Sequence, residues 1–287
     1  MKKYLKDGFV VYHYEFDTLQ QFLTQIQSRP INQNVFSELR SHATDTRTIK
    51  FTGTKDFEEA VDLCQKGWSE DFEKLVSIKK RIDERLLLPS IKPRQVQDIV
   101  GYNPSVPDYL IGNPLNMWNK TKKQISDFIN IYINIDYSHK TDKNSIFNRG
   151  IIVQSLIDAL QQKGYSVRFK AFSCSHTYNE ILFASFNLKN DGEKLNIKKT
   201  YFPLCHPSFI RRLGFLLEET TPFKCKIWQD GYGLPSGFTI FKNIINPGPN
   251  DIIITQPSEM DIRGYDIYDD LESFLMHTNL QEFLTRI

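Results

Sequence analysis

Long apolar runs, a charge excess of one sign and paired cysteines are all scarce in this chain of 287 residues. Apolar runs such as residues 86–88 and 252–254 fall far short of the roughly 20 residues that a membrane span needs. Asp7, His13 and Glu15 interrupt what would have to be the apolar core of a signal peptide. We therefore expect an intracellular protein with no membrane partner.

The charges nearly balance, with 36 Lys and Arg against 34 Asp and Glu, so no global field steers the chain toward nucleic acid. The balance of charge leaves open whether basic residues gather in a local patch. The four cysteines form no CxxC pair, which argues against a zinc module or a disulfide framework. Cys174 with His176 and Cys205 with His206 could form a composite metal site if the two segments meet. Packing in the core explains the same cysteines without a metal.

The composition is that of a globular protein, with 40% hydrophobic and 24% charged residues, and its length allows one large domain or two smaller ones. Residues 1–125 read as a helical, loop-rich region. A strand is predicted over 9–14, and helices over 19–26, 57–64 and 69–87. Asp17 or Thr18 caps the first of these helices, Thr54 or Asp56 caps the second, and Gly67 ends it.

Residues 89–118 contain five prolines and two glycines, which forbid a long regular element. We interpret this segment as a structured connector. It is rich in apolar side chains, which predicts packing across the face of a domain. The side chains concerned are Tyr102, Val106, Tyr109, Leu110, Met117 and Trp118.

Residues 126–287 read as an α/β domain. A strand over 128–135, a helix over 147–162 and a strand over 165–172 predict a parallel pair with a right-handed crossover. Further strands are expected over 181–188, antiparallel along the edge, and over 195–204, 224–228 and 251–255. A helix should begin after Pro207, and residues 271–287 should form a terminal one.

Asp136 and Ser138 follow the first of these strands, where open α/β sheets gather ligands. Asp-x-Ser at this point is similar to the start of the metal-ion-dependent adhesion site of von Willebrand factor A (vWA) domains. The order of elements from about residue 128 onward also resembles that fold. The resemblance implies a three-layer, vWA-like or Rossmann-like sheet and a Mg²⁺ site at Asp136 and Ser138. Lys140 stands where that motif has its second serine, so the metal site would be degenerate. Otherwise Asp136 caps its loop or pairs with a basic neighbour.

Three further segments resemble an uncharacterised family of tailed-bacteriophage and prophage proteins. They are residues 101–117, the helix that Arg149 and Gly150 open, and residues 206–215. This resemblance implies a phage setting: the cytoplasm of a bacterial host, or the virion. It implies no reaction.

The segment from His206 to Arg212 allows two interpretations. His206 could act as an acid or base, while Ser208, Arg211 and Arg212 could hold an anion at a helix start. Alternatively, Pro207 and Ser208 simply initiate a helix.

The chain contains no GxxxxGK[ST], GxGxxG, HExxH or GxSxG motif. We therefore expect a non-enzymatic interaction protein that grips a phage or host protein with the carboxyl edge of its sheet. The residues predicted to bind the partner are Asp136, Ser138, Arg149, His206, Ser208, Arg211 and Arg212.

Two alternatives stay open. In a nucleic-acid-binding or metal-dependent nucleic-acid-acting protein, the three arginines would meet phosphates, and Asp136 with Glu259 or Asp261 would hold a cation. The other alternative is a structural component of the virion.

Overall fold

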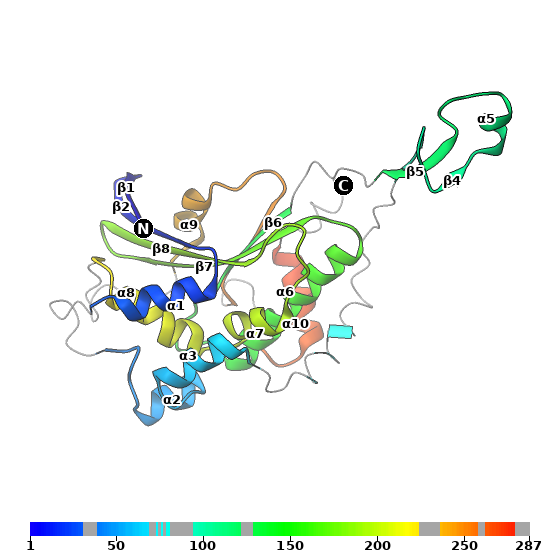
Figure 1. Ribbon diagram of the computed structural model, residues 1–287. Coiled ribbons are helices and arrows are strands. Elements are labelled where there is room, and N and C mark those ends of the chain that lie inside the picture. The colour runs from blue at the N-terminus through cyan, green and yellow to red at the C-terminus, as the bar shows by residue number, and fades with distance from the viewer. Residues whose placement is uncertain are drawn as a thin grey trace.

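The computed structural model describes residues 1–30, 39–68, 94–121, 129–223, 236–257 and 262–278, together with residues 73, 76, 79 and 80. In these ranges the chain forms a six-stranded mixed sheet with helices, and a smaller three-stranded sheet (Figure 1). Most of the helix predicted over 69–87, the strand predicted over 224–228 and residues 279–287 lie outside the described residues.

The large sheet has the strand order β1-β2-β8-β7-β6-β9. The strands span Lys2–Lys6 (β1), Phe9–Phe16 (β2), Glu180–Lys189 (β8), Val167–His176 (β7), Ile129–Asn134 (β6) and Asp251–Ile254 (β9). Strand β6 pairs in parallel with β7 on one side and with β9 on the other. The connection from β6 to β7 runs through α6, Lys143–Gln162. This strand-helix-strand unit confirms the predicted parallel pair.

Strand β8 lies inside the sheet, which corrects its predicted place at the edge. It pairs antiparallel with β7, as expected, but β2 runs in parallel along its other side. Strands from both sides of residue 125 therefore share one sheet. The division of the chain at that residue stays a prediction.

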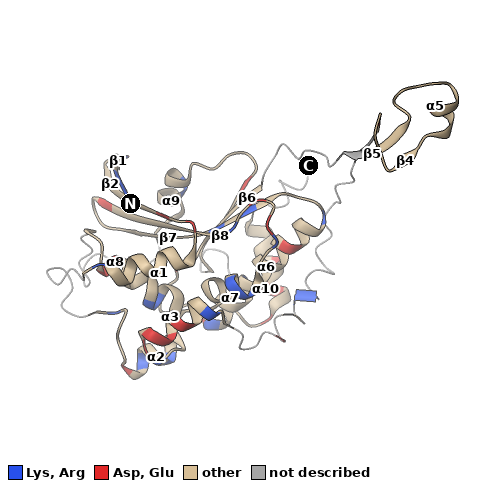
Figure 2. Cartoon of the chain, viewed as in Figure 1, with Lys and Arg blue, Asp and Glu red and all other residues tan. Residues whose placement is uncertain are grey.

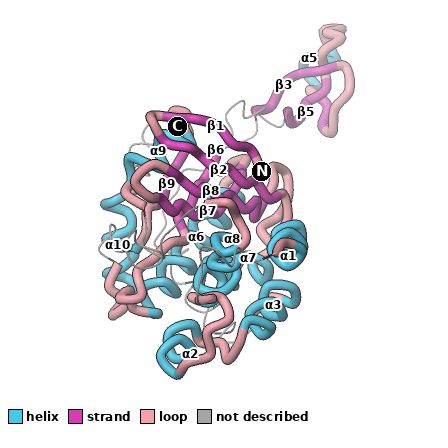
Figure 3. The backbone as a smooth tube through the Cα atoms, turned by 90° about the vertical axis from the view of Figure 1, so that its left-hand side faces the viewer, coloured by secondary structure: helices cyan, strands magenta, loops and turns pink. Residues whose placement is uncertain are grey.

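Most helices cover one face of this sheet, as Figure 3 shows. They are α1 (Leu19–Ser28), α2 (Thr46–Thr52), α3 (Phe57–Lys66), α6, α7 (Ile197–Cys205), the π-helix η1 (Phe209–Gly214), α8 (Phe215–Glu219) and α10 (Ile267–His277). Helix α9 (Phe238–Ile245) packs on the opposite face, where the ring of Phe241 meets Phe172 of β7 at 5.0 Å between centroids. No helix among the described residues is long and apolar enough to cross a membrane.

The main core fills the space between the sheet and its covering helices. Alternation along the strands sends one set of apolar side chains into it, such as Tyr12, Tyr14 and Phe16 of β2. Of the two cap residues predicted for each helix start, the structure uses Thr18 for α1 and Asp56 for α3. The Thr18 hydroxyl accepts from the Gln21 N–H, and the carboxylate of Asp56 accepts from the Glu59 N–H.

The sequence predicts a strand over 195–204, but the chain forms α7 from Ile197 to Cys205. The Asn196 side chain accepts from the Lys199 N–H and caps the helix. Its buried side, including Tyr201 and Leu204, belongs to the main core. Tertiary packing and a cap therefore outweigh the weak β propensity of this segment.

Residues 94–121 form a small unit of short strands and one short helix, and no long regular element occurs in it, as predicted. Strands β3 (Arg94–Asp98) and β4 (Asn103–Pro104) both pair with β5 (Met117–Thr121), and α5 (Val106–Leu110) lies between β4 and β5. Figure 1 draws this unit apart from the large sheet. The expectation that its apolar side chains pack across a domain face is wrong, because most of them are exposed.

Candidate functional site

Asp136 sits at the carboxyl edge of the large sheet and is held by the next strand. One carboxylate oxygen accepts from the Ser173 hydroxyl at 2.6 Å, and the other accepts from the Cys174 N–H at 2.7 Å. Its own N–H donates to the side chain of Asn134 at 2.7 Å. Burial raises the pKa of Asp136 to about 6, against the opposing effect of these hydrogen bonds.

A second buried carboxylate, Glu218 of α8, lies on the same small cavity as Asp136. The Ser175 hydroxyl donates to one of its oxygens, and the other oxygen has no partner among the described residues. Burial raises the pKa of Glu218 to about 8. Sequence reasoning missed this residue. The sequence indicates it only by placing an acidic side chain directly after the apolar residues 215–217.

The Asp136 and Ser138 side chains do not form the predicted metal site together. Both oxygens of Asp136 are engaged with β7, whereas the Ser138 hydroxyl accepts from the Lys140 N–H within its own loop. No group of three His, Cys, Asp or Glu side chains suited to a metal occurs in the described part of the chain. These residues therefore do not fit Mg²⁺, which prefers six oxygens in octahedral array. Glu259 and Asp261 lie outside the described residues.

The composite Cys/His site is not formed among the described residues either. Cys174 and Cys205 are fully buried, and burial raises the pKa of both thiols. His176 instead shares a hydrogen bond with the Ser236 hydroxyl at 2.9 Å.

Arg149 is a buried connector between two strand ends. Its Nη1 donates to the carbonyl of Asn134 after β6 at 2.8 Å and to that of Thr255 after β9 at 2.6 Å. Burial lowers the pKa of Arg149 to about 10. The side chain is 0% exposed, so it does not reach a phosphate on a partner in this arrangement.

Arg212 is also 0% exposed and ties η1 to the N-terminal segment. It donates to the hydroxyl and carbonyl of Thr54 at 2.7 and 2.8 Å, and to the carbonyls of Ser41 and Ala43 at 3.2 and 3.1 Å. Arg211 is half-buried: its guanidinium donates to the Tyr137 carbonyl at 2.7 Å and lies over the ring of Phe215. The guanidinium groups of this pair are therefore used within the chain.

His206 and Ser208 are buried at the junction between α7 and η1. The Ser208 N–H donates to Nδ1 of His206 at 3.2 Å, so a neutral imidazole carries its proton on Nε2. Burial lowers the pKa of His206 to about 4, which keeps the ring uncharged at neutral pH. The Ser208 hydroxyl has no partner within the described residues.

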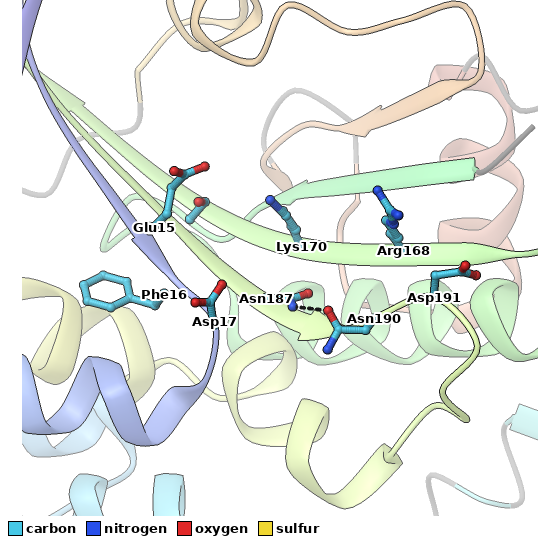
Figure 4. Close-up of a pocket in the computed structure, with 9 residues that line it drawn as sticks. Glu15, Phe16, Asp17, Arg168, Lys170, Asn187, Asn190 and Asp191 are labelled. Atoms are coloured by element: carbon cyan, nitrogen blue, oxygen red, sulfur yellow. Dashed lines mark hydrogen bonds between the residues drawn. The ribbon is translucent and has the colours of Figure 1, made fainter. Parts of the chain in front are cut away.

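The exposed face of the sheet carries a polar groove of about 640 Å³ that no motif indicated (Figure 4). Arg168 and Lys170 of β7 line it opposite Glu15, and the Asn187 side chain donates to Asn190 at 2.6 Å. Lys2 already pairs with Glu15 at 2.8 Å. Because the groove mixes both signs of charge, it favours no one class of charged ligand.

The small unit of residues 94–121 is held by half-buried polar contacts and exposes many of its apolar side chains. The carboxylate of Asp108 accepts from the side chains of Ser105, Gln97 and Asn113. By contrast, a run of large apolar side chains is exposed. It comprises Ile99, Val100, Tyr102, Val106, Tyr109, Leu110, Ile111 and Leu115.

A family model described as a domain of unknown function, DUF7192, matches residues 3–282. The chain belongs to the DUF7192 family. The DUF7192 match spans both the large sheet and the small unit. Neither a curated protein nor a solved structure matches the chain.

Proposed function

We propose that this chain is a non-enzymatic binding protein that engages a protein partner through the exposed apolar side chains of residues 99–115. The observation that carries the proposal is the exposure of large apolar side chains on a unit with regular structure. The side chains of Gln97 and Ser105 donate to the Asp108 carboxylate, while Tyr109, Leu110 and Ile111 are 69, 76 and 79% exposed. Contiguous exposed apolar patches on a monomer mark interaction surfaces.

The charge of the unit favours an apolar protein surface as the partner. Residues 94–121 contain two basic and two acidic side chains, at Arg94, Lys120, Asp98 and Asp108. The unit is accordingly almost wholly tan in Figure 2. A segment that binds the surface of an anionic membrane carries a basic face instead.

The partner surface of this proposal differs from the carboxyl edge expected from the sequence. Asp136, Arg149 and Arg212 are buried and bonded within the chain, so binding through them would first break those bonds. The same burial weakens the nucleic-acid alternative, which needs exposed arginines.

A vWA-like sheet and a phage setting remain part of the proposal. The antiparallel β8, the parallel β7 and β6, and β9 on the far side of β6 support the first. The segments of residues 101–117, 149–160 and 206–215 support the second.

Site-specific photo-crosslinking in cells tests the surface. A photoreactive phenylalanine analogue replaces Tyr109 in the full chain, and in a matched control it replaces Tyr178, which is 96% exposed outside the unit. We expect one discrete protein adduct from position 109, none from position 178, and loss of the adduct when Leu110→Asp is added. The proposal fails if position 109 links only to lipid or nucleic acid, or if both positions give the same adducts.

A further inference from the structure

A cavity of about 150 Å³ lies where the end of α2, the start of α6 and the end of α7 meet. Its lining includes Gly53, Trp68, Lys143, Phe147, His206 and Pro207. No acidic side chain lines it in the described part of the chain. The cavity is distinct from the apolar unit and from the buried pair of Asp136 and Glu218.

Two hydrogen-bond donors, Nε2 of His206 and Nζ of Lys143, lie near the same part of the cavity lining, beside Gly53. A Cβ atom added to Gly53 would lie 3.4 Å from Nε2 of His206 and 3.8 Å from Nζ of Lys143. Because Nδ1 of His206 accepts from the Ser208 N–H, Nε2 of the neutral ring carries the proton and donates. Within the described ranges, nothing accepts a hydrogen bond from either Nε2 or Nζ.

Gly53 keeps this point open for a backbone reason as well. It ends α2 in the left-handed region, with φ of 76°, and its N–H donates to the Ile49 carbonyl. Glycine adopts that conformation without strain. Because Gly53 has no side chain, it leaves both donors uncovered at this point of the cavity lining.

Aromatic rings form the apolar wall beside the donors. Trp68 stacks on Tyr201 with centroids 4.5 Å apart and planes 16° apart, and it meets the ring of His206 edge-on at 4.7 Å. Rigid apolar walls with a few convergent polar groups are the usual make-up of a small-molecule site. A cavity of this volume holds roughly one six-membered ring.

We propose that this cavity binds a small planar organic anion. Its carboxylate or phosphate oxygens accept from Nε2 of His206 and Nζ of Lys143, and its ring lies against Trp68. Lys50, in the last turn of α2, adds positive charge near Lys143, while Asp142, which caps α6, adds a smaller negative contribution there. This activity is separate from protein binding by the apolar unit, and either can fail without the other.

Calorimetric titration of the full chain tests the class of ligand. The probes are benzoate and phenyl phosphate, with neutral benzamide as the shape control and inorganic phosphate as the charge control. We expect saturable binding of at least one ring anion, with at least tenfold weaker binding of benzamide and of inorganic phosphate. Failure of both ring anions overturns the proposal, as does equal binding of benzamide or binding of inorganic phosphate alone.

Matched variants test the place of binding. Lys143→Met should weaken binding of the ring anion at least tenfold. Because Lys143 is exposed, we expect the variant to fold normally, and circular dichroism checks this. Lys140→Met removes the same charge from an exposed side chain three positions earlier and should change affinity less than twofold. Gly53→Ala should also weaken binding, since the added methyl group covers both donors. Equal affinity of Lys143→Met and wild type, or equal loss in Lys140→Met, contradicts this site.

Discussion

Glu218 and Glu219 are neighbours in α8 with opposite surroundings. Glu218 accepts one hydroxyl hydrogen bond and leaves its other oxygen without a described partner. Glu219 accepts from the backbone N–H groups of Arg40 and Ser41 and from the Ser41 hydroxyl. The first environment favours the protonated acid, whereas the second uses the carboxylate as an acceptor.

This difference predicts how stability depends on pH. Burial raises the pKa of folded Glu218 to about 8 from an ordinary value of 4.5, so the folded chain binds this proton more tightly than the unfolded chain. The contribution of Glu218 to stability is then full below about pH 4.5 and declines as the pH rises toward about 8, by up to about 1.4 kcal/mol per pH unit. Asp136 adds a decline of the same sign as the pH rises toward its own pKa of about 6.

We expect Glu218→Gln to remove the Glu218 part of this decline. Urea denaturation should find the variant more stable than wild type at about pH 8.5 and close to wild type at about pH 4.5. Glu219→Gln, the matched control, should lower stability at both pH values by about 1–3 kcal/mol, because two backbone donors lose a charged acceptor. If Glu218→Gln destabilises the chain equally at both pH values, protonation of Glu218 does not cause the decline of stability with pH.

The residues of the His206 cavity show why a site of this kind escapes sequence reasoning. The sequence around His206 predicts a site that Ser208, Arg211 and Arg212 complete. The residues that lie near Nε2 are instead Gly53 at the end of α2 and Lys143 at the start of α6. Only tertiary packing brings those segments together.

At the scale of elements, the sequence predicts those helices and strands whose formation depends on neighbouring residues. Neighbouring residues predict the caps at Thr18 and Asp56 and the strands over 128–135 and 165–172, and helices α1 and α3 and strands β6 and β7 form there. The pairing of β2 with β8 joins segments that lie far apart in the sequence, so no local pattern indicates the interior place of β8. In residues 197–205, likewise, propensity does not decide between strand and helix. The Asn196 cap and burial against α6 favour the helix α7.

Gly150 lets α6 and α7 approach closely, although glycine inside a helix usually weakens it. A Cβ atom at Gly150 would lie 2.3 Å from Sγ of Cys205 and 2.9 Å from the Leu204 carbonyl oxygen. The atoms of α7 that face Gly150 thus belong to the backbone as well as to a side chain. The backbone carbonyl cannot move aside by a side-chain rotation.

We expect Gly150→Ala to destabilise the chain by about 1–3 kcal/mol despite the better helix propensity of alanine. Adding Cys205→Ala should restore part of this loss, since it removes the sulfur but not the Leu204 carbonyl. Thermal and urea unfolding of the two single variants and the double variant give the coupling energy. A Gly150→Ala variant as stable as wild type would mean that α6 and α7 have room to separate.

At the scale of the whole molecule, the large sheet depends on the first strands of the chain. β2 covers one side of β8 and adds Tyr12, Tyr14 and Phe16 to the main core. The ring of Phe16 stacks on Phe186 of β8 at 5.5 Å between centroids. Without residues 1–16, the interior strand β8 would become an edge with unpaired backbone groups and an uncovered apolar face.

The fragment of residues 126–287 should therefore not fold as an independent domain, although the sequence predicts a boundary near residue 125. Each large apolar side chain of β2 removed from the core forfeits about 1.5–3 kcal/mol of burial, and a whole domain is stable by only about 5–15 kcal/mol. We expect the full chain to unfold in one cooperative transition and the fragment to aggregate or to lack such a transition in circular dichroism and calorimetry. Adding residues 1–30 in front of the fragment through a flexible linker should recover more ordered structure than adding residues 39–68. A fragment that melts cooperatively on its own would instead make the N-terminal strands an accessory to a self-sufficient domain.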